Sequence, residues 1–202
     1  MAIIAMTANT TAALPSVTAD YKPTVTRLPE AAAHLEGPLT LPDGTTVHVR
    51  PIRSGDAPAL RAFHARLSPD TIELRYFGLV PVLTDQQVHH LTELDYEDRM
   101  ALIATTGAGT DEQLIAVVRY ERIGPETAEV AFVVEDQWQH HGIASALFRL
   151  LVGYAREHGF RTLVAEVMAT NTPMRTLLCH AGYPCTLAYK SGAVEFRLDI
   201  MR

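Results

Sequence analysis

The sequence predicts one mixed α/β (α+β) domain in which a mostly antiparallel central sheet is flanked by helices. Short runs of β-branched and apolar residues alternate with stretches whose apolar positions recur at helical spacing. Three of these runs, at 100–105, 114–120 and 128–134, follow one another with turn residues between them, as in an antiparallel meander. A length of 202 residues, 48% of them hydrophobic and 20% charged, is enough for one core.

The expected elements run in the order two strands, three helices, three strands, one helix, one strand, one helix and two strands. Strands are predicted at 39–41, 45–49, 100–105, 114–120, 128–134, 163–168, 184–190 and 193–200, and helices from about 54, from 68 to 76, from about 84, from 142 to 158 and from 172 to 180. The residues Pro42–Asp43–Gly44 supply the turn between the first two strands, and Gly159 and Gly182 each follow the end of a helix.

The N-terminal residues 1–37 differ from the rest in composition. They are rich in Ala, Thr and Pro and show no sustained period, and Pro15, Pro23 and Pro29 would interrupt any helix. We therefore expect a flexible extension over 1–37, with a short helix at 30–35, and a domain over 38–202.

Charge and composition exclude several classes of protein. A formal charge of −6 argues against a broadly basic nucleic-acid binder and favours cationic partners such as amines. No apolar run approaches the roughly 18 residues that a membrane span needs. The first basic residue, Lys22, comes too late for a secretory signal. Cys179 and Cys185 match no zinc spacing, so we expect reduced thiols, no metal and a cytoplasmic location.

The segment 133–144 carries the chemistry that local pattern can reveal. A buried strand ends there, a short loop containing Gly142 follows, and a long amphipathic helix begins. Backbone N–H groups and the positive end of the helix then point to one place, which favours an anion such as phosphate. Gly142 would let a phosphate approach the backbone closely, and Ala144 keeps the first helical turn small.

Gln139, Gly142 and Ala144 match the Gln/Arg-x-x-Gly-x-Gly/Ala signature, and by it the chain resembles the GNAT superfamily of acetyl-CoA-dependent N-acetyltransferases. The order of elements from Val47 to Ile200 agrees with that fold, whose central sheet has splayed strands. The resemblance implies acetyl-CoA as co-substrate. The residues that it implies for binding are Phe132, Val133 and Val134 along the pantetheine arm, Gln139, His140, His141, Gly142, Ile143, Ala144 and Ser145 around the pyrophosphate, and Asn171 after the next strand.

Two of these positions leave alternatives open. His140 and His141 depart from the small or basic residues common in the family. They are either neutral side chains that face solvent or additional phosphate donors when protonated. A metal role is disfavoured because adjacent residues rarely bind one ion without other ligands.

A narrower resemblance concerns the acceptor. The segments Arg50–Pro51–Ile52–Arg53, 67–78 and 128–132 are similar to bacterial protein-lysine acetyltransferases that modify acyl-CoA synthetases. The resemblance implies a protein lysine as the acceptor and an acyl-CoA synthetase as a possible partner.

Glu129 is the expected general base. A lysine ammonium must lose a proton before its nitrogen can attack a thioester, and a carboxylate nearby can take that proton directly or through a water. Glu129 shares a strand face with Ala131 and Val133, so we expect desolvation to raise its pKa. The alternatives are a solvent-facing Glu129 without such a role, and Glu166 as the competing carboxylate.

One position departs from the family pattern. Many GNAT enzymes place a Tyr after the Asn as proton donor to the leaving thiolate, and the corresponding residue here is Leu178. A thiolate leaves readily at neutral pH, so a dedicated acid is dispensable. A covalent route through Cys179 is disfavoured because the sequence shows no base partner.

The expected function is transfer of acetyl from acetyl-CoA to a protein lysine by direct attack in a ternary complex. The alternatives are an acetyltransferase for a small amine and a catalytically silent sensor of coenzyme A. Neither oligomeric state nor acyl-chain preference follows from the sequence.

Overall fold

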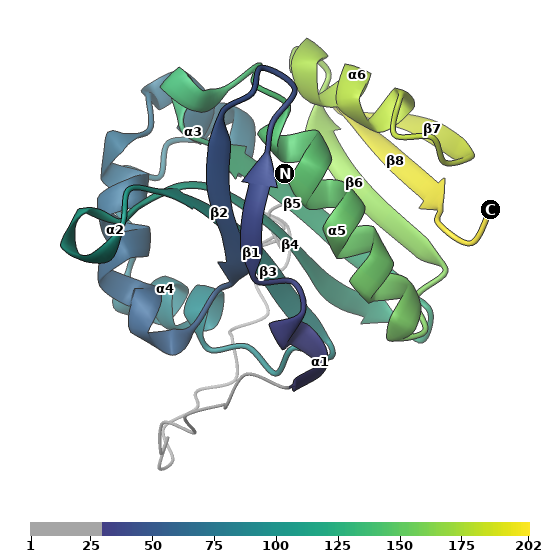
Figure 1. The fold of residues 1–202 in the computed structure, drawn as a ribbon. Helices are drawn as coiled ribbons and strands as arrows, with labels where there is room; N and C mark the ends of the chain where they lie inside the picture. The colour runs from purple at the N-terminus through teal and green to yellow at the C-terminus, as the bar shows by residue number, and fades with distance from the viewer. Residues whose placement is uncertain (1–29) are drawn as a thin grey trace, which may run out of the picture.

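An eight-stranded sheet with one parallel pairing forms the centre of the molecule (Figure 1). The structure, a computed structural model, describes residues 30–202. The strands are β1 (Gly37–Thr40), β2 (Thr46–Pro51), β3 (Arg99–Thr106), β4 (Gln113–Gly124), β5 (Thr127–Val134), β6 (Thr162–Met168), β7 (Cys185–Lys190) and β8 (Ala193–Asp199). They lie in the order β1-β2-β3-β4-β5-β6-β8-β7, which confirms the expected mixed, mostly antiparallel sheet.

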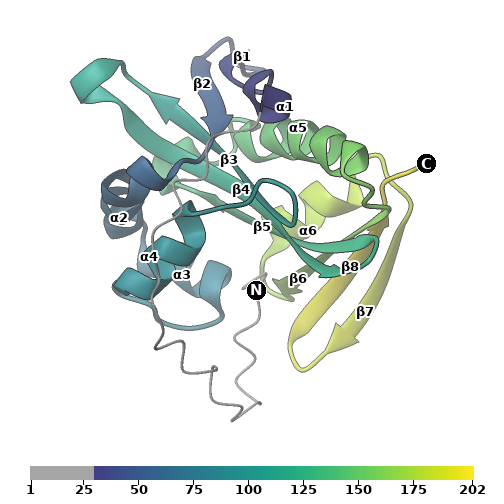
Figure 2. The same cartoon turned by 90° about the horizontal axis from the view of Figure 1, so that it is seen from below.

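Helices cover both faces of this sheet (Figure 2). They are α1 (Glu30–Ala33), α2 (Ala57–Arg66), α3 (Pro69–Tyr76), α4 (Asp85–Thr92), α5 (Ile143–Glu157) and α6 (Thr172–Cys179). The long helix α5 lies over one face, while α2, α3 and α4 lie on the other. Its apolar stripe is buried, and Phe148 meets Phe132 of β5 edge-on with ring centroids 5.2 Å apart. No helix within 30–202 has both the length and the apolar character of a membrane span.

The strands β5 and β6 diverge, as the family resemblance implies. Their parallel pairing covers only Thr127–Glu129 on β5 and Thr162–Val164 on β6. Both strands continue beyond these residues without pairing to each other. The sheet therefore opens into a wedge on the carboxyl side of Glu129, and backbone groups along the wedge are left for other partners.

Two apolar residues that precede the expected boundary at residue 38 are buried. Ala32 and Leu35 are three residues apart, so they share one side of the turn at α1, and both are buried in the core. Ala32 and Leu35 thus pack against the domain, and the short helix expected at 30–35 is present as α1. The rest of the expected extension, 1–29, lies outside the described residues.

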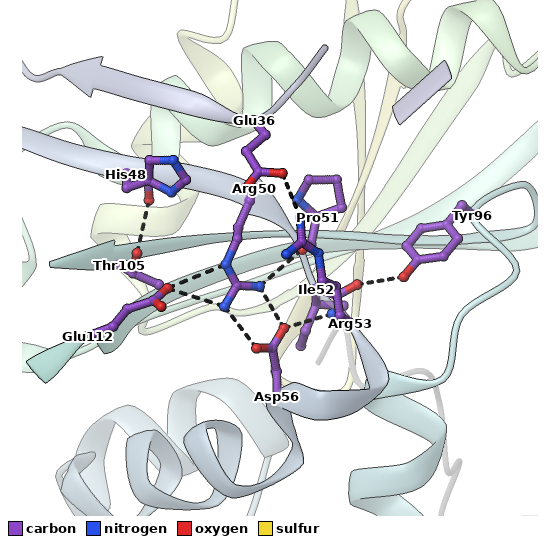
Figure 3. Close-up of polar contacts among 10 residues, drawn as sticks. All are labelled: Glu36, His48, Arg50, Pro51, Ile52, Arg53, Asp56, Tyr96, Thr105 and Glu112. Carbon is purple, nitrogen blue, oxygen red and sulfur yellow. Dashed lines mark hydrogen bonds and ion pairs between the residues drawn. The ribbon is translucent and has the colours of Figure 1, made fainter. Parts of the chain in front are cut away.

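A buried arginine fastens β2 to the start of α2 (Figure 3). Arg50 is 8% exposed, and its two terminal nitrogens lie 2.7 and 2.8 Å from the two carboxylate oxygens of Asp56. Glu112 accepts a further bond from the same guanidinium at 3.2 Å, and Asp56 also accepts from the backbone N–H of Arg53. The segment 50–53, which carried part of the resemblance, therefore has a structural role in this joint.

Candidate active site

A cavity of about 370 Å³ lies where β5 and β6 diverge and α5 begins. The residues that line it are Phe132, Val133 and Val134 of β5, Trp138, Gln139, His140, Gly142, Ile143, Ala144 and Ser145 of the loop and the first turn of α5, Thr71, Leu74 and Arg75 of α3, and Asn171, Pro173, Met174, Thr176 and Leu177 at α6. Ten of the eleven residues expected to bind the cofactor are among them.

The start of α5 gives this cavity donors for an anion. Gly142 is the N-cap residue, and no side chain caps the helix there. The first backbone bond of the helix runs from the N–H of Ala146 to the carbonyl of Gly142. The N–H groups of the preceding turn have no intrahelical partner, which is the arrangement that binds phosphate at a helix N-terminus.

Gly142 is required for reasons beyond a close phosphate. Its φ is +81°, in the left-handed region that favours glycine. A Cβ at this position would lie 3.1 Å from Cδ of Pro42 in the turn between β1 and β2. The backbone conformation and the packed turn therefore both demand glycine, independently of any ligand.

Side-chain hydrogen bonds fix the loop before α5 to α3. The amide nitrogen of Gln139 donates to the Thr71 hydroxyl at 3.0 Å and to the Val134 carbonyl at 3.1 Å. Asp136 accepts from the Thr71 hydroxyl at 2.7 Å and from the backbone N–H of Ser68 at 2.9 Å. Partial burial alone would raise the pKa of Asp136, but these bonds outweigh it and hold the pKa below its ordinary value.

The two histidines have different places. His140 lines the cavity with a positive φ of 66°. His141 is the one expected cofactor residue outside the lining, because its Nδ1 lies 2.5 Å from a carboxylate oxygen of Asp43. That hydrogen bond is the main cause that lowers the pKa of Asp43 to about 2. The His141 side chain thus links the turn at 42–44 to the loop.

Glu129 lies half-buried on the face of the sheet that α3 covers. Burial raises its pKa from 4.5 to about 7; Arg75 opposes this shift, while Glu166 and Glu121 add to it. The expected direction agrees with this shift, but the surroundings are not only small and apolar: Glu121 lies directly opposite on β4. Glu129 lies outside the cavity wall, three residues before Phe132, which is roughly 10 Å along a strand.

A second cavity, of about 30 Å³, continues the wedge between β5 and β6. It shares Arg75 and Asn171 with the larger cavity, and Glu166 is in its wall. Glu166 is exposed. Both candidate carboxylates therefore lie near the wedge, with Glu129 the more desolvated of the two.

The α6 region contains no tyrosine in the cavity wall. Leu178 is fully buried in the core. Its hydrocarbon side chain has no proton to donate to the leaving thiolate. The side chain of Asn171 accepts from the N–H of Met174 at 3.2 Å and caps α6.

The two cysteines lie in different surroundings. Cys179 is exposed. The pKa of the Cys185 thiol is raised, mainly by burial and to a smaller extent by the nearby Cys179. Across residues 30–202, no three His, Cys, Asp or Glu side chains gather as a metal site would require.

Sequence reasoning missed the contribution of α3 to the cavity. Thr71, Leu74 and Arg75 line it from the side opposite to α5. Their spacing of three and four residues places them on one side of a helix, which is a signal that the sequence contains. The pattern does not say which cavity that side faces.

Comparisons with known proteins agree with this geometry. Residues 46–184 match the family model described as an acetyltransferase (GNAT) domain. The acetyltransferase PA5475 of Pseudomonas aeruginosa is 32% identical over 145 residues, which cover 71% of this chain and 78% of the relative. The acetyltransferase Pat of Mycolicibacterium smegmatis is 31% identical over 147 residues, 72% of this chain but only 43% of the relative.

Solved structures give the same result. The crystal structure of the GNAT domain of S. lividans PAT is 38% identical, with a TM-score of 0.77, over 83% of this chain and 98% of that one. A cAMP-binding acyltransferase from Mycobacterium smegmatis is 26% identical, with a TM-score of 0.59, over 88% of this chain and 55% of that one. This chain thus spans about half the length of the mycobacterial proteins that it matches. The chain belongs to the GNAT family and is an N-acetyltransferase.

Proposed function

We propose that this chain transfers acetyl from acetyl-CoA to the ε-amine of a protein lysine, with Glu129 as general base. The observation that carries the proposal is the single cavity that brings together ten of the eleven residues expected to bind the cofactor. GNAT acetyltransferases use acetyl-CoA, and the residues at this cavity fit its parts.

The fit follows from the chemistry of the walls. Uncapped N–H groups at the start of α5 suit the pyrophosphate, which is an anion. Residues 130–134 of β5 pair with β4 on one edge but not with β6 on the other, so this free edge presents strand backbone to the amides of the pantetheine arm. Bound in this way, the cofactor supplies an activated thioester carbonyl, and a backbone N–H of β5 polarises its oxygen.

Glu129 accepts the proton that the acceptor ammonium must lose. A carboxylate with a pKa of about 7 is largely ionised at pH 8 and is basic enough to take a proton from an ammonium, directly or through a water. The amine nitrogen then forms a bond to the carbonyl carbon, the bond from that carbon to sulfur breaks, and the extra proton on the nitrogen passes to the released sulfur or to water. The leaving thiolate needs no donor at the position of Leu178.

The acceptor assignment rests on relatives. Two of the matches carry the name Pat or PAT, and the resemblance in segments 50–53, 67–78 and 128–132 is to enzymes that modify lysines of acyl-CoA synthetases. We therefore propose an acyl-CoA synthetase as the protein partner and the cytoplasm as the location. A small amine remains the second candidate acceptor, because Glu129 can deprotonate either kind of ammonium.

The test is mass spectrometry of an acyl-CoA synthetase after incubation with this protein and acetyl-CoA. We expect one lysine to gain an acetyl group, and the rate to fall by about 10²–10⁴-fold in Glu129→Gln. The matched control is Glu126→Gln, at an exposed carboxylate in the turn between β4 and β5.

Other outcomes would redirect the assignment. Consumption of acetyl-CoA with small amines but not with the synthetase would favour the small-molecule enzyme. Binding of acetyl-CoA without consumption under either condition would favour the sensor. Full activity of Glu129→Gln would show that another group, with Glu166 first, takes the proton.

A further inference from the structure

A row of charged side chains crosses the sheet beside Glu129. In the antiparallel pairing, Arg99 of β3 lies opposite Glu121 of β4, and Glu121 lies opposite Glu129 of β5. Side chains directly opposite in an antiparallel pair lie on the same face with Cβ atoms about 5 Å apart. The Glu121 carboxylate is therefore an immediate neighbour of the proposed base.

His90 of α4 lies over this row and contacts two of its members. Its Nε2 is 3.2 Å from a carboxylate oxygen of Glu121, and its Nδ1 is 3.2 Å from a terminal nitrogen of Arg99. The same guanidinium donates to the backbone carbonyls of His90 and Glu93, and Asp95 lies 3.6 Å from it. These contacts hold Arg99 in place beneath α4.

The hydrogen bonds determine the tautomer of His90. A guanidinium can only donate, so the Nδ1 that faces Arg99 must accept. The ring proton then lies on Nε2 and is donated to Glu121. Because Nδ1 is occupied by Arg99, the ring has no free nitrogen through which to pass a proton on. It orients Glu121 and is not a proton shuttle.

We infer that Glu121, held by His90, whose ring Arg99 fixes in turn, is a positioning residue for acetyl transfer, and that its negative charge beside Glu129 keeps that carboxylate basic enough to accept the proton of the incoming ammonium. The inference rests on the proposed function, since it assigns a role relative to Glu129 as base. Neither Glu121 nor His90 lines either cavity, so both act through Glu129 and not on the substrate.

Charges of both signs surround Glu129, and each favours either its ionised or its protonated form. Arg75 of α3 favours its ionised form, while Glu121 of β4 and Glu166 of β6 favour its protonated form. Arg119, two residues before Glu121 on β4 and opposite Ala131, is buried and shares the same face. Loss of the Glu121 charge leaves the positive groups less opposed, so Glu129 should ionise at lower pH.

The experiment is the pH profile of kcat/KM for the full chain with acetyl-CoA and an acceptor. In Glu121→Gln we expect the acidic limb, which reports ionisation of Glu129, to move to lower pH by roughly 0.5–1 unit. The plateau should fall roughly threefold, since a weaker base transfers protons less well. Glu126→Gln is the control and should leave both unchanged.

A pair of variants at His90 tests the orienting role. His90→Gln retains one donor and one acceptor, so it should keep the wild-type profile, whereas His90→Phe should shift the limb in the direction of Glu121→Gln. This pair also decides the matter if Glu121→Gln fails to fold beside the buried Arg119.

The outcomes separate the two proposals. If Glu129→Gln is inactive but neither Glu121→Gln nor His90→Phe moves the limb, the role of Glu121 is refuted and the general base stands. If His90→Gln is as impaired as His90→Phe, the orienting role is refuted in favour of a titrating ring. If Glu129→Gln keeps full activity, the proposed base is wrong and the inference falls with it.

Discussion

Replacing Glu129 with Gln should make the protein more stable at alkaline pH while it abolishes most activity. The half-buried carboxylate is raised in pKa from 4.5 to about 7, chiefly by burial. Unfolding exposes it to water and restores the ordinary value, so the folded state binds the proton more tightly than the unfolded state. The stability that this group contributes is therefore fully present below about pH 4.5 and is lost as pH rises through about 7.

The size of the effect follows from the two pKa values. A change from 4.5 to about 7 corresponds to about 3 kcal/mol in the free energy of unfolding at pH 8, and to less than about 1 kcal/mol at pH 5. Gln has nearly the same shape as Glu but carries no charge to desolvate. We therefore expect Glu129→Gln to be more stable than the wild type by up to about 3 kcal/mol at pH 8, and by much less at pH 5.

The assay is urea unfolding of the wild type, Glu129→Gln and Glu126→Gln at about pH 5, 6.5 and 8. Equal slopes with urea would show that the same surface is exposed in each case, so that the midpoints compare stability directly. Glu126 is exposed and should show no such pH dependence. If the stability of Glu129→Gln relative to the wild type does not increase from pH 5 to pH 8, Glu129 holds no desolvated charge. The physical argument for it as a base is then refuted.

Three further predictions concern the framework of the site. Arg50→Ala should lower the free energy of unfolding by about 3–5 kcal/mol in chemical denaturation, because the charge of Asp56 is left without its main partner; a loss below about 1 kcal/mol would contradict this. Gly142→Ala should weaken coenzyme A binding roughly tenfold by calorimetry, since the left-handed conformation costs about 1–2 kcal/mol and the new Cβ crowds Pro42; unchanged affinity would show that the loop adapts. Asn171→Ala should remove the cap of α6 and lower the melting temperature by a few degrees in scanning calorimetry, corresponding to about 1 kcal/mol, and an unaltered melting temperature would mean that the cap adds nothing.

The burial of Glu129 favours activity but lowers the stability of the folded protein. A carboxylate that is basic enough to accept a proton near neutral pH must be kept from full solvation, and that raises the free energy of its ionised form in the folded state. The rest of the fold offsets this cost through the core around β4 and β5. Residues 114–120 of β4 are all buried. Active sites commonly carry such strain, and substitutions that relieve it stabilise the protein at the expense of function.

Local sequence predicted those features whose interactions lie within a few residues. A strand, a glycine with positive φ and an amphipathic helix are specified by neighbouring positions, so the loop before α5 and α5 itself were expected at nearly their observed bounds. The parallel pairing that ends at Glu129 and Val164 agrees with the splayed sheet implied by the family resemblance. Glu129 as general base was predicted from its place in the strand before the loop, and it stays a prediction.

Contacts between distant segments could not be predicted in the same way. His141 and Asp43 are 98 positions apart, and the bond between them takes His141 away from the cavity where the resemblance had placed it. Gln139 and Thr71 are 68 positions apart, and their bond brings α3 to the cavity. The burial of Ala32 and Leu35, which precede the expected boundary at residue 38, likewise depends on contacts with the core.

The sequence by itself determined the family, the order of elements and the residue types at the site, because these depend on local periodicity and on a short motif. The tertiary structure decided the proton affinity of Glu129. Burial in the folded sheet raises its pKa most, helix packing brought Arg75 near it, and strand register placed Glu121 beside it. The interaction between two charges depends on their separation and on the solvent between them, and both are set only when strands and helices from distant parts of the chain come together.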